Sequence, residues 1–80
     1  MIMTGETLYI STNSGIKKDG NNWYNAKFLD DEQDEFFVAF INERLYQSLQ
    51  GLSKKTPVIL TLNIVPGSKY FNVDDIEVLV

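Results

Sequence analysis

Two residue types that carry much of protein chemistry are missing from this 80-residue sequence, cysteine and histidine. Without cysteine the chain has no disulfide, no thiolate metal site and no cysteine nucleophile. Without histidine it lacks the commonest general base and the commonest zinc ligand. Basic residues are also few, with seven lysines and arginines against 11 aspartates and glutamates and a formal net charge of −4. These absences argue against an enzyme and against a protein coated with positive charge.

Long apolar runs are missing as well. The longest strictly apolar runs have four to six residues, whereas a helix needs about 20 to span a bilayer. The first residues, Met1–Glu6, lack the basic region followed by an apolar region that marks a signal peptide. We therefore expect a cytoplasmic protein that does not associate with membranes.

The size and composition predict one small globular domain. Hydrophobic residues make up 44% of the sequence, which is ordinary for a folded protein and too high for a disordered one. We expect residues 1–80 to form a single domain around one small core. Such a core leaves little room for a deep catalytic pocket.

The first half of the chain alternates apolar and polar residues, as strands with one buried face do. In the segment 6–16, Leu8 and Ile10 are expected on one face and Tyr9 on the other. The segment 22–29 alternates in the same way, and the glycine and asparagines at 20–22 predict a hairpin between the two strands. Its expected inner face holds Tyr24, Ala26 and Phe28, and its outer face holds Trp23, Asn25 and Lys27.

The middle of the chain predicts a strand followed by a short helix. The segment 35–41 is almost continuously apolar, which is typical of a strand buried on both faces. After it, leucines recur at positions 45, 49 and 52, a helical spacing. Asn42 is a suitable N-cap and Gly51 a suitable stop, so we predict a helix over 43–50.

Two further strands are predicted at 57–65 and 70–80, separated by the turn signal Pro66-Gly67. The pair Asp74-Asp75 breaks the alternation of the last strand and predicts a bulge. The resulting order is β-β-β-α-β-β. It predicts a mostly β fold, a five-stranded OB-fold-like barrel with one short helix between strands 3 and 4. An SH3-like barrel is the nearest alternative.

The acidic runs do not form recognisable metal sites. A calcium loop needs alternating ligands around a central glycine, and the run 30–35 has no glycine. Nothing in the sequence fixes a paired geometry between this run and the acids at 74–77. We therefore expect no catalytic residue, no metal and no cofactor.

Binding residues are easier to find. Lys17 and Lys18 lie in the predicted hairpin just before Trp23, and Asn25 and Lys27 share the face of Trp23. Lysines neutralise phosphates, and an exposed aromatic ring can stack on a base. The alternatives are that Trp23 belongs to the core or to a dimer interface, and that the two lysines only solvate a turn.

Three more residues join this set. Lys69 lies in the predicted turn 66–69, and Tyr70 follows it directly. In an OB barrel, loops 1–2 and 4–5 border the usual binding surface. Tyr9 is expected beside Trp23 across the strand pair. Four phenylalanines are assigned instead to the core or to a subunit interface: Phe28, Phe36, Phe40 and Phe71. The predicted nucleic-acid-binding residues are Tyr9, Lys17, Lys18, Trp23, Asn25, Lys27, Lys69 and Tyr70.

Two stretches of this sequence are similar to the single-stranded DNA-binding proteins of filamentous phages. They are the glycine-bounded basic hairpin with its aromatic strand, 15–25, and the hydrophobic–acidic–hydrophobic ending, 70–78. The resemblance implies a dimeric OB-fold protein associated with DNA replication. It also implies that Lys17 and Lys18 contact phosphates and that Trp23 or Tyr24 stacks on a base. The acidic net charge and the helix at 43–50 depart from the family and favour a relative from another phage or mobile element.

Three functions therefore stand as hypotheses. The first is binding of single-stranded DNA, or of RNA, by a homodimer or higher homo-oligomer. The second is a small protein-interaction or accessory module that binds no nucleic acid. The third is an acidic mimic of DNA, which would need the carboxylates of 30–35 and 74–77 on one face.

Overall fold

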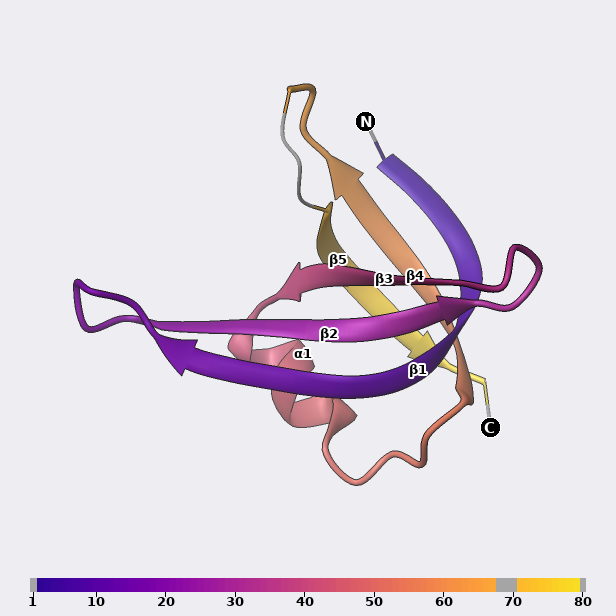
Figure 1. Ribbon diagram of the computed structural model, residues 1–80, viewed down its shortest axis with the longest axis horizontal. Coiled ribbons are helices and arrows are strands. Elements are labelled where there is room, and N and C mark those ends of the chain that lie inside the picture. The colour runs from indigo at the N-terminus through magenta and orange to yellow at the C-terminus, as the bar shows by residue number, and fades with distance from the viewer. Residues whose placement is uncertain (1, 68–70, 80) are drawn as a thin grey trace.

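The computed structural model describes residues 2–67 and 71–79 and contains five strands and one helix in the predicted order. The strands close into a barrel in the order β1-β2-β3-β5-β4, with the helix between β3 and β4 (Figure 1). This confirms the mostly β, OB-fold-like barrel. The elements are β1 (Ile2–Ile16), β2 (Asn22–Asp30), β3 (Glu35–Ile41), α1 (Glu43–Leu49), β4 (Thr56–Ile64) and β5 (Phe71–Val78).

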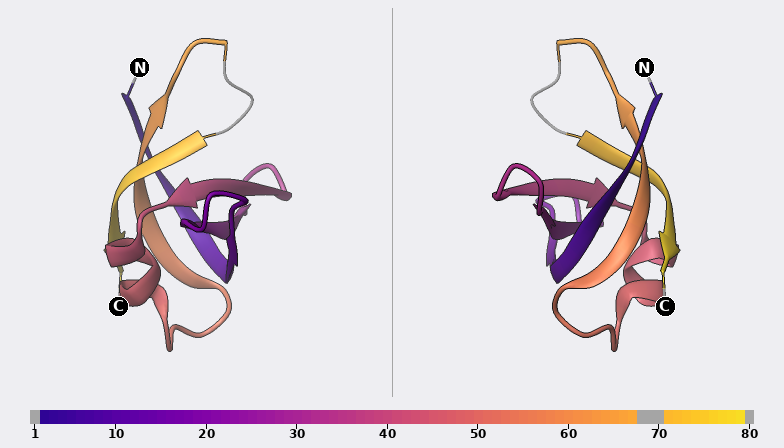
Figure 2. Two further views of the ribbon diagram at one scale, coloured as in Figure 1. Left: turned by 90° about the vertical axis from the view of Figure 1, so that its left-hand side faces the viewer. Right: turned by 90° about the vertical axis from the view of Figure 1, so that its right-hand side faces the viewer.

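β1 joins the two halves of the barrel. Its first half pairs with β4, from Ile2 to Tyr9, and its second half pairs with β2, from Leu8 to Ile16. The register with β2 shifts between Tyr9 and Ser11, so Ile10 is an extra residue on β1. Such a bulge bends and twists a strand. The strand can therefore turn from β4 and β5 toward β2 and β3, which cross them at a steep angle (Figure 2).

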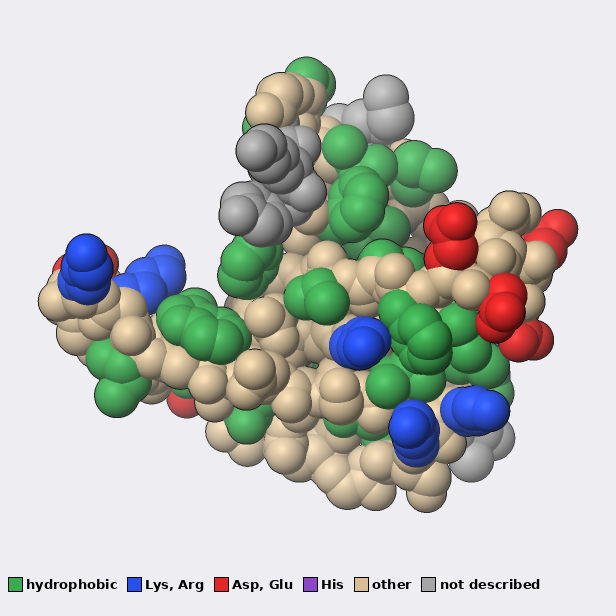
Figure 3. All heavy atoms as spheres, in the orientation of Figure 1, with side chains coloured by type: hydrophobic (Ala, Val, Ile, Leu, Met, Phe, Trp, Pro, Cys, Tyr) green, Lys and Arg blue, Asp and Glu red, His purple; other side chains and the backbone are tan. Residues whose placement is uncertain are grey.

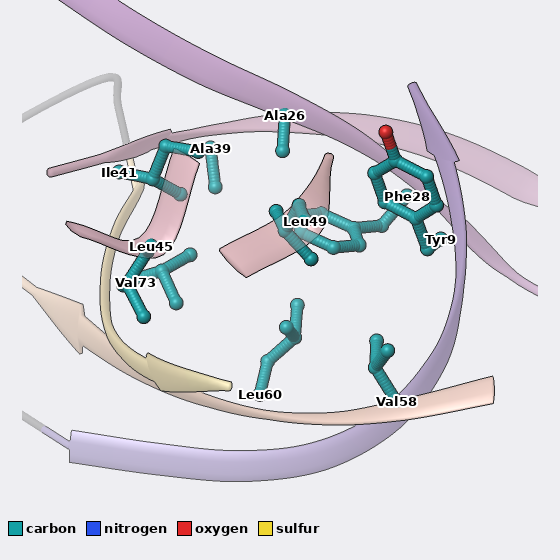
Figure 4. Packing of buried hydrophobic residues seen from close by; sticks show 10 residues of the cluster. All are labelled: Tyr9, Ala26, Phe28, Ala39, Ile41, Leu45, Leu49, Val58, Leu60 and Val73. Atoms are coloured by element: carbon teal, nitrogen blue, oxygen red, sulfur yellow. The ribbon is translucent and has the colours of Figure 1, made fainter. Parts of the chain in front are cut away.

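The inward face of β1 differs from the predicted one. Tyr9 is buried, only 6% exposed, and its ring lies 6.5 Å from that of Phe28, centroid to centroid (Figure 4). Leu8 and Ile10 are only partly buried. The prediction that Tyr9 lies beside Trp23 across the strand pair is therefore wrong. Both faces of this segment carry large apolar side chains, so alternation alone did not show which face points inward.

The other inward faces meet in one cluster. Ala26 and Phe28 on β2 are fully buried, as predicted, and Tyr24 packs against the same cluster. The core contains Tyr9, Ala26, Phe28, Ala39, Ile41, Leu45, Leu49, Val58, Leu60 and Val73 (Figure 4).

α1 covers one end of this core. Its buried residues are Leu45 and Leu49, and Asn42 caps it by accepting the Leu45 N–H on Oδ1 at 2.8 Å. Gly51 follows with a φ of +86°, a conformation that glycine adopts at little cost. The predicted cap, stop and leucine face are thus confirmed. Among the described residues, no helix has the length and apolar character needed to cross a membrane.

β3 is not buried on both faces, contrary to the prediction. Ala39 and Ile41 point into the core, whereas Phe36 and Val38 are 55% and 49% exposed. The barrel has a single layer of strands and its only described helix lies at one end. The outward face of β3 is therefore left to solvent in spite of its apolar sequence.

The seam between β3 and β5 is short. In the described part of the chain these two strands form only two residue pairs, Ala39 with Phe71 and Phe40 with Asn72. β5 pairs at length with β4, and its register shifts there, so that Asp74 is an extra residue. The bulge predicted at Asp74-Asp75 is confirmed.

One polar atom in the barrel wall generates a stability prediction. Among the described residues, no hydrogen-bond partner is found for the buried hydroxyl of Thr7, which lies opposite the fully buried Val58. A buried polar group without a partner costs about 1–3 kcal/mol. We expect Thr7→Val to raise the free energy of unfolding by about 1 kcal/mol, measured by urea denaturation. Thr4→Val, at an exposed position of the same strand, should change it by less than about 0.5 kcal/mol. Equal changes in the free energy of unfolding for the two variants would contradict the view that the Thr7 hydroxyl is buried without a partner.

Candidate nucleic-acid interface

The candidate site lies on the outward side of β2 and β3, which we call the outer face. It consists of Trp23, Asn25 and Lys27 on β2 and of Phe36, Val38 and Phe40 on β3. Asn25 lies opposite Phe40 and Lys27 lies opposite Val38. Side chains that are paired in this way share one side of a sheet. Aromatic, amide and ammonium groups therefore stand next to one another on a surface open to solvent.

Trp23 owes its position to a glycine. It lies directly opposite Gly15 on β1, and a Cβ atom at Gly15 would come within 2.5 Å of two carbon atoms of the indole. The indole therefore occupies the space that any side chain at position 15 would need. This contact leaves Trp23 partly exposed on the outer face and keeps it out of the core. The predicted neighbour Tyr9 is instead buried against Phe28.

Two hollows adjoin Trp23. The larger has a volume of about 530 Å³ and is lined by residues of the hairpin, β2, the end of β3, the start of α1 and β5. The smaller, of about 350 Å³, is lined by Lys17, Trp23, Asn25 and Phe40. Lys17, Trp23 and Phe40 line both. The surface is correspondingly indented between the projecting hairpin and the body of the molecule (Figure 3).

The β1–β2 hairpin extends well beyond the barrel and carries Lys17 and Lys18 at its tip (Figures 1 and 3). The Lys17 N–H donates to the Asn21 carbonyl at 2.7 Å, and the Gly20 N–H donates to the Lys17 carbonyl at 3.0 Å. The Asp19 carboxylate accepts the Asn21 N–H at 3.0 Å. Hydrogen bonds from Asn21 and, to a smaller extent, the charge of Lys17 lower the pKa of Asp19. The turn that holds the lysines is thus internally bonded.

Lys27 extends the basic character along the outer face. Its Nζ lies 4.8 Å from the centroid of the Phe36 ring, a distance at which an ammonium group is attracted to an aromatic face. The contact holds a positive charge above an exposed ring. A phosphate at Lys27 would therefore lie close to an aromatic surface.

The structure brings together part of the predicted set. Lys17, Trp23 and Asn25 surround the hollows, Lys27 lies farther along the outer face, and Lys18 is exposed at the hairpin tip. Tyr9 was predicted on this surface, and that prediction is wrong because its ring fills the core. Lys69 and Tyr70 lie outside the described residues.

Sequence reasoning missed Phe36 and Phe40, which it assigned to the core or to an interface. The sequence signal that could have identified them as outward-facing is Ala39, which lies between them. Ala39 lies directly opposite Ala26, and both are completely buried. Two small residues that face each other mark the inner side of a narrow barrel. Because side chains alternate along a strand, Phe36 and Phe40, an odd number of residues from Ala39, point outward, whereas Phe37 shares its inner face.

Most of the acidic residues lie away from the hollows; the exceptions are Glu43, which lines the larger one, and Asp19, which lies in the hairpin turn close to Lys17. The β2–β3 loop, with its acids at 30–35, is at the opposite end of the outer face from the hairpin tip (Figure 3). Glu6 and Glu77 flank Ile59 on the sheet of β1, β4 and β5. Among the described residues, no group of acids is placed to hold a metal ion.

No protein-family model and no curated protein matches the chain. The resemblance to the phage single-stranded DNA-binding proteins therefore stays a prediction, and function has to be argued from the site itself.

The contact between Gly15 and Trp23 can be tested directly. In Gly15→Ala the new methyl group should push the indole off β1, since the space is already filled. We expect a red shift of the tryptophan emission and stronger quenching by acrylamide. Gly5→Ala is the matched control, because a Cβ at Gly5 meets no atom within 4 Å. Emission spectra that are identical in Gly15→Ala and the unmodified protein would contradict the proposed packing.

Proposed function

We propose that this protein binds single-stranded nucleic acid, and DNA in particular, through the outer face and the β1–β2 hairpin. The observation that carries the proposal is the combination of Trp23, Phe36 and Phe40 with Lys17 and Lys27 on one open surface. Single-strand binders combine such stacking rings with cations that follow the backbone. The outer face of strands 2 and 3 is also the usual ligand surface of OB-type barrels.

The expected energetics put most of the affinity on the aromatic residues. If Lys17, Lys18 and Lys27 each neutralise one phosphate, the slope of log affinity against log salt would be about −2 for a single strand. Each stacked base adds about 1–3 kcal/mol. With so few cations, two or three stacked bases are needed for useful affinity. A duplex keeps its bases stacked inside, so it should bind much more weakly.

The wider parts of the proposal follow from the resemblance and not from the site. They are an origin in a phage or mobile element and assembly as a homodimer or higher homo-oligomer. RNA is an alternative ligand, because stacking and phosphate contacts do not separate it from DNA without a contact to the 2′-hydroxyl.

A second candidate function is supported by the same surface. Phe36 and Val38 are half exposed side by side with Lys27, and an apolar patch of this kind also suits a protein partner. A protein-interaction module would use the outer face without needing a nucleic acid. The titration described next separates the two functions.

Trp23 is the single tryptophan of the chain, so its fluorescence reports on the site alone. Titration with oligo-dT at low salt should quench the emission strongly because a base stacks on the indole, and added salt should reverse the effect. A duplex of the same length serves as the control and should change the signal little. No response to any oligonucleotide at micromolar concentration would reject nucleic-acid binding and favour the protein-interaction module.

The hairpin lysines supply a second test. The double substitution Lys17→Ala and Lys18→Ala should weaken oligo-dT binding at low salt and flatten the salt slope by about 1.4, at about 0.7 per phosphate contact. Fluorescence anisotropy of a labelled oligonucleotide at several salt concentrations measures this slope. The matched variant Lys17→Arg with Lys18→Arg keeps both charges and should keep the slope. An unchanged salt slope in the alanine variant would mean that the nucleic acid does not contact these two lysines.

A further inference from the structure

The two hollows beside Trp23 differ in chemistry, although they share Lys17, Trp23 and Phe40. The smaller adds one further residue, the amide Asn25. The larger adds three asparagine side chains and a carboxylate, from Asn22, Asn42, Asn72 and Glu43. Stacking on the shared rings needs none of these groups. Such groups can hydrogen-bond to the edge of a ligand whose face stacks on the rings.

Each of these polar groups has a definite hydrogen-bonding character. The Asn42 Oδ1 accepts the Leu45 N–H, a bond that orients the side-chain amide, and the NH₂ of the same amide is a donor. Glu43 is the next residue, and an ionised carboxylate can only accept. Asn22 donates its Nδ2 to the Tyr24 hydroxyl at 3.3 Å. A donor and a two-oxygen acceptor therefore lie next to each other where α1 begins.

A carboxylate on a surface that binds a polyanion needs an explanation. Placed against a phosphate, Glu43 would repel the strand. Placed against the edge of a neutral base, it costs no such repulsion and can accept hydrogen bonds from the ring. Guanine is the base that presents two adjacent donors, N1–H and the 2-amino group, with the acceptor O6 beside them. Thymine offers one donor between two acceptors, which fits a carboxylate poorly.

We propose that the larger hollow is a binding site for guanine, an inference that rests on the proposed function. The base stacks against Trp23 and Phe40, Glu43 accepts from N1–H and the 2-amino group, and the amide of Asn42 or Asn72 donates to O6. Lys17, which lines both hollows, neutralises the adjacent phosphate. The volume of about 530 Å³ is within the range of about 300–1,000 Å³ typical of small-ligand sites.

This assignment makes the protein selective at one position of the bound strand. The smaller hollow, with its single amide, stacks any base. The larger should favour guanine over thymine by about tenfold, within the range for a two-bonded base contact. Inosine is the most specific comparison, because it differs from guanosine only in the missing 2-amino group.

The experiment is a competition assay with the full chain. Short oligo-dT strands with one interior dG, dI or dA compete with a fluorescein-labelled oligo-dT, and anisotropy measures the displacement. We expect the dG strand to compete about tenfold better than oligo-dT, and the dI strand to lose most of that advantage. In Glu43→Gln the preference for dG over dT should disappear, because the two-oxygen acceptor is lost. Glu6→Gln removes the same charge from the sheet of β1 and β4 and should keep the preference.

The outcomes separate the two levels of the proposal. Equal competition by the dG, dI and dT strands against a measurable oligo-dT affinity would overturn the guanine site and leave single-strand binding intact. Loss of the dG preference in Glu6→Gln as well as in Glu43→Gln would also overturn it, since the effect would then be one of net charge. Failure of every strand to bind would reject the proposed function, and the guanine site with it.

Discussion

The pairing of one strand with both halves of the barrel is the constraint on which the rest of this structure depends. β1 pairs with β4 along its first half and with β2 along its second, and the bulge at Ile10 lets it bend between them. The barrel that results is so narrow that Ala26 and Ala39 face each other with no exposed surface. Side chains alternate between the two faces of a strand, so the positions on β3 between and beside the inward residues Ala39 and Ile41 point outward. Phe36, Val38 and Phe40 lie at these positions, and their apolar character creates the apolar outer face.

The same strand also positions the tryptophan. Beyond the bulge, β1 continues alongside β2 far enough to place Gly15 opposite Trp23. A bare backbone there lets the indole pack against the strand and remain partly exposed, a known way in which an aromatic residue covers a glycine across a strand pair. The ring is thereby held in one place before any ligand arrives. Pre-ordering of this kind reduces the entropy that a stacking residue loses on binding.

The sequence predicted the order of elements because each carries a local signal. Alternation marks β2, Asn42 and the leucine spacing mark α1, and Asp74-Asp75 marks the bulge of β5. Which face of each strand points into the core was harder to predict, because this depends on contacts between residues that are distant in the chain. Tyr9 was placed outside and proved to be in the core, since β1 carries bulky residues on both sides. Phe40 is assigned by sequence to the core or to a subunit interface, whereas in the structure it lines both hollows, since it follows the inward residue Ala39 on the strand.

The net charge of −4 does not by itself decide whether this chain can bind a polyanion. The lysine-bearing hairpin tip and the acidic β2–β3 loop lie at opposite ends of the longest dimension of the molecule, 37 Å (Figure 3). At physiological ionic strength the Debye length is about 8 Å, so charges on that loop are largely screened at the hairpin. The field near the hollows is set by Lys17 and Lys18 and by the carboxylates of Asp19 and Glu43. A nucleic-acid strand bound as proposed would meet the two lysines with Asp19 beside them, and the acids on the other side would disfavour its spreading onto β4 and β5. An acidic protein can thus confine a nucleic acid to one face, which a uniformly basic one cannot do.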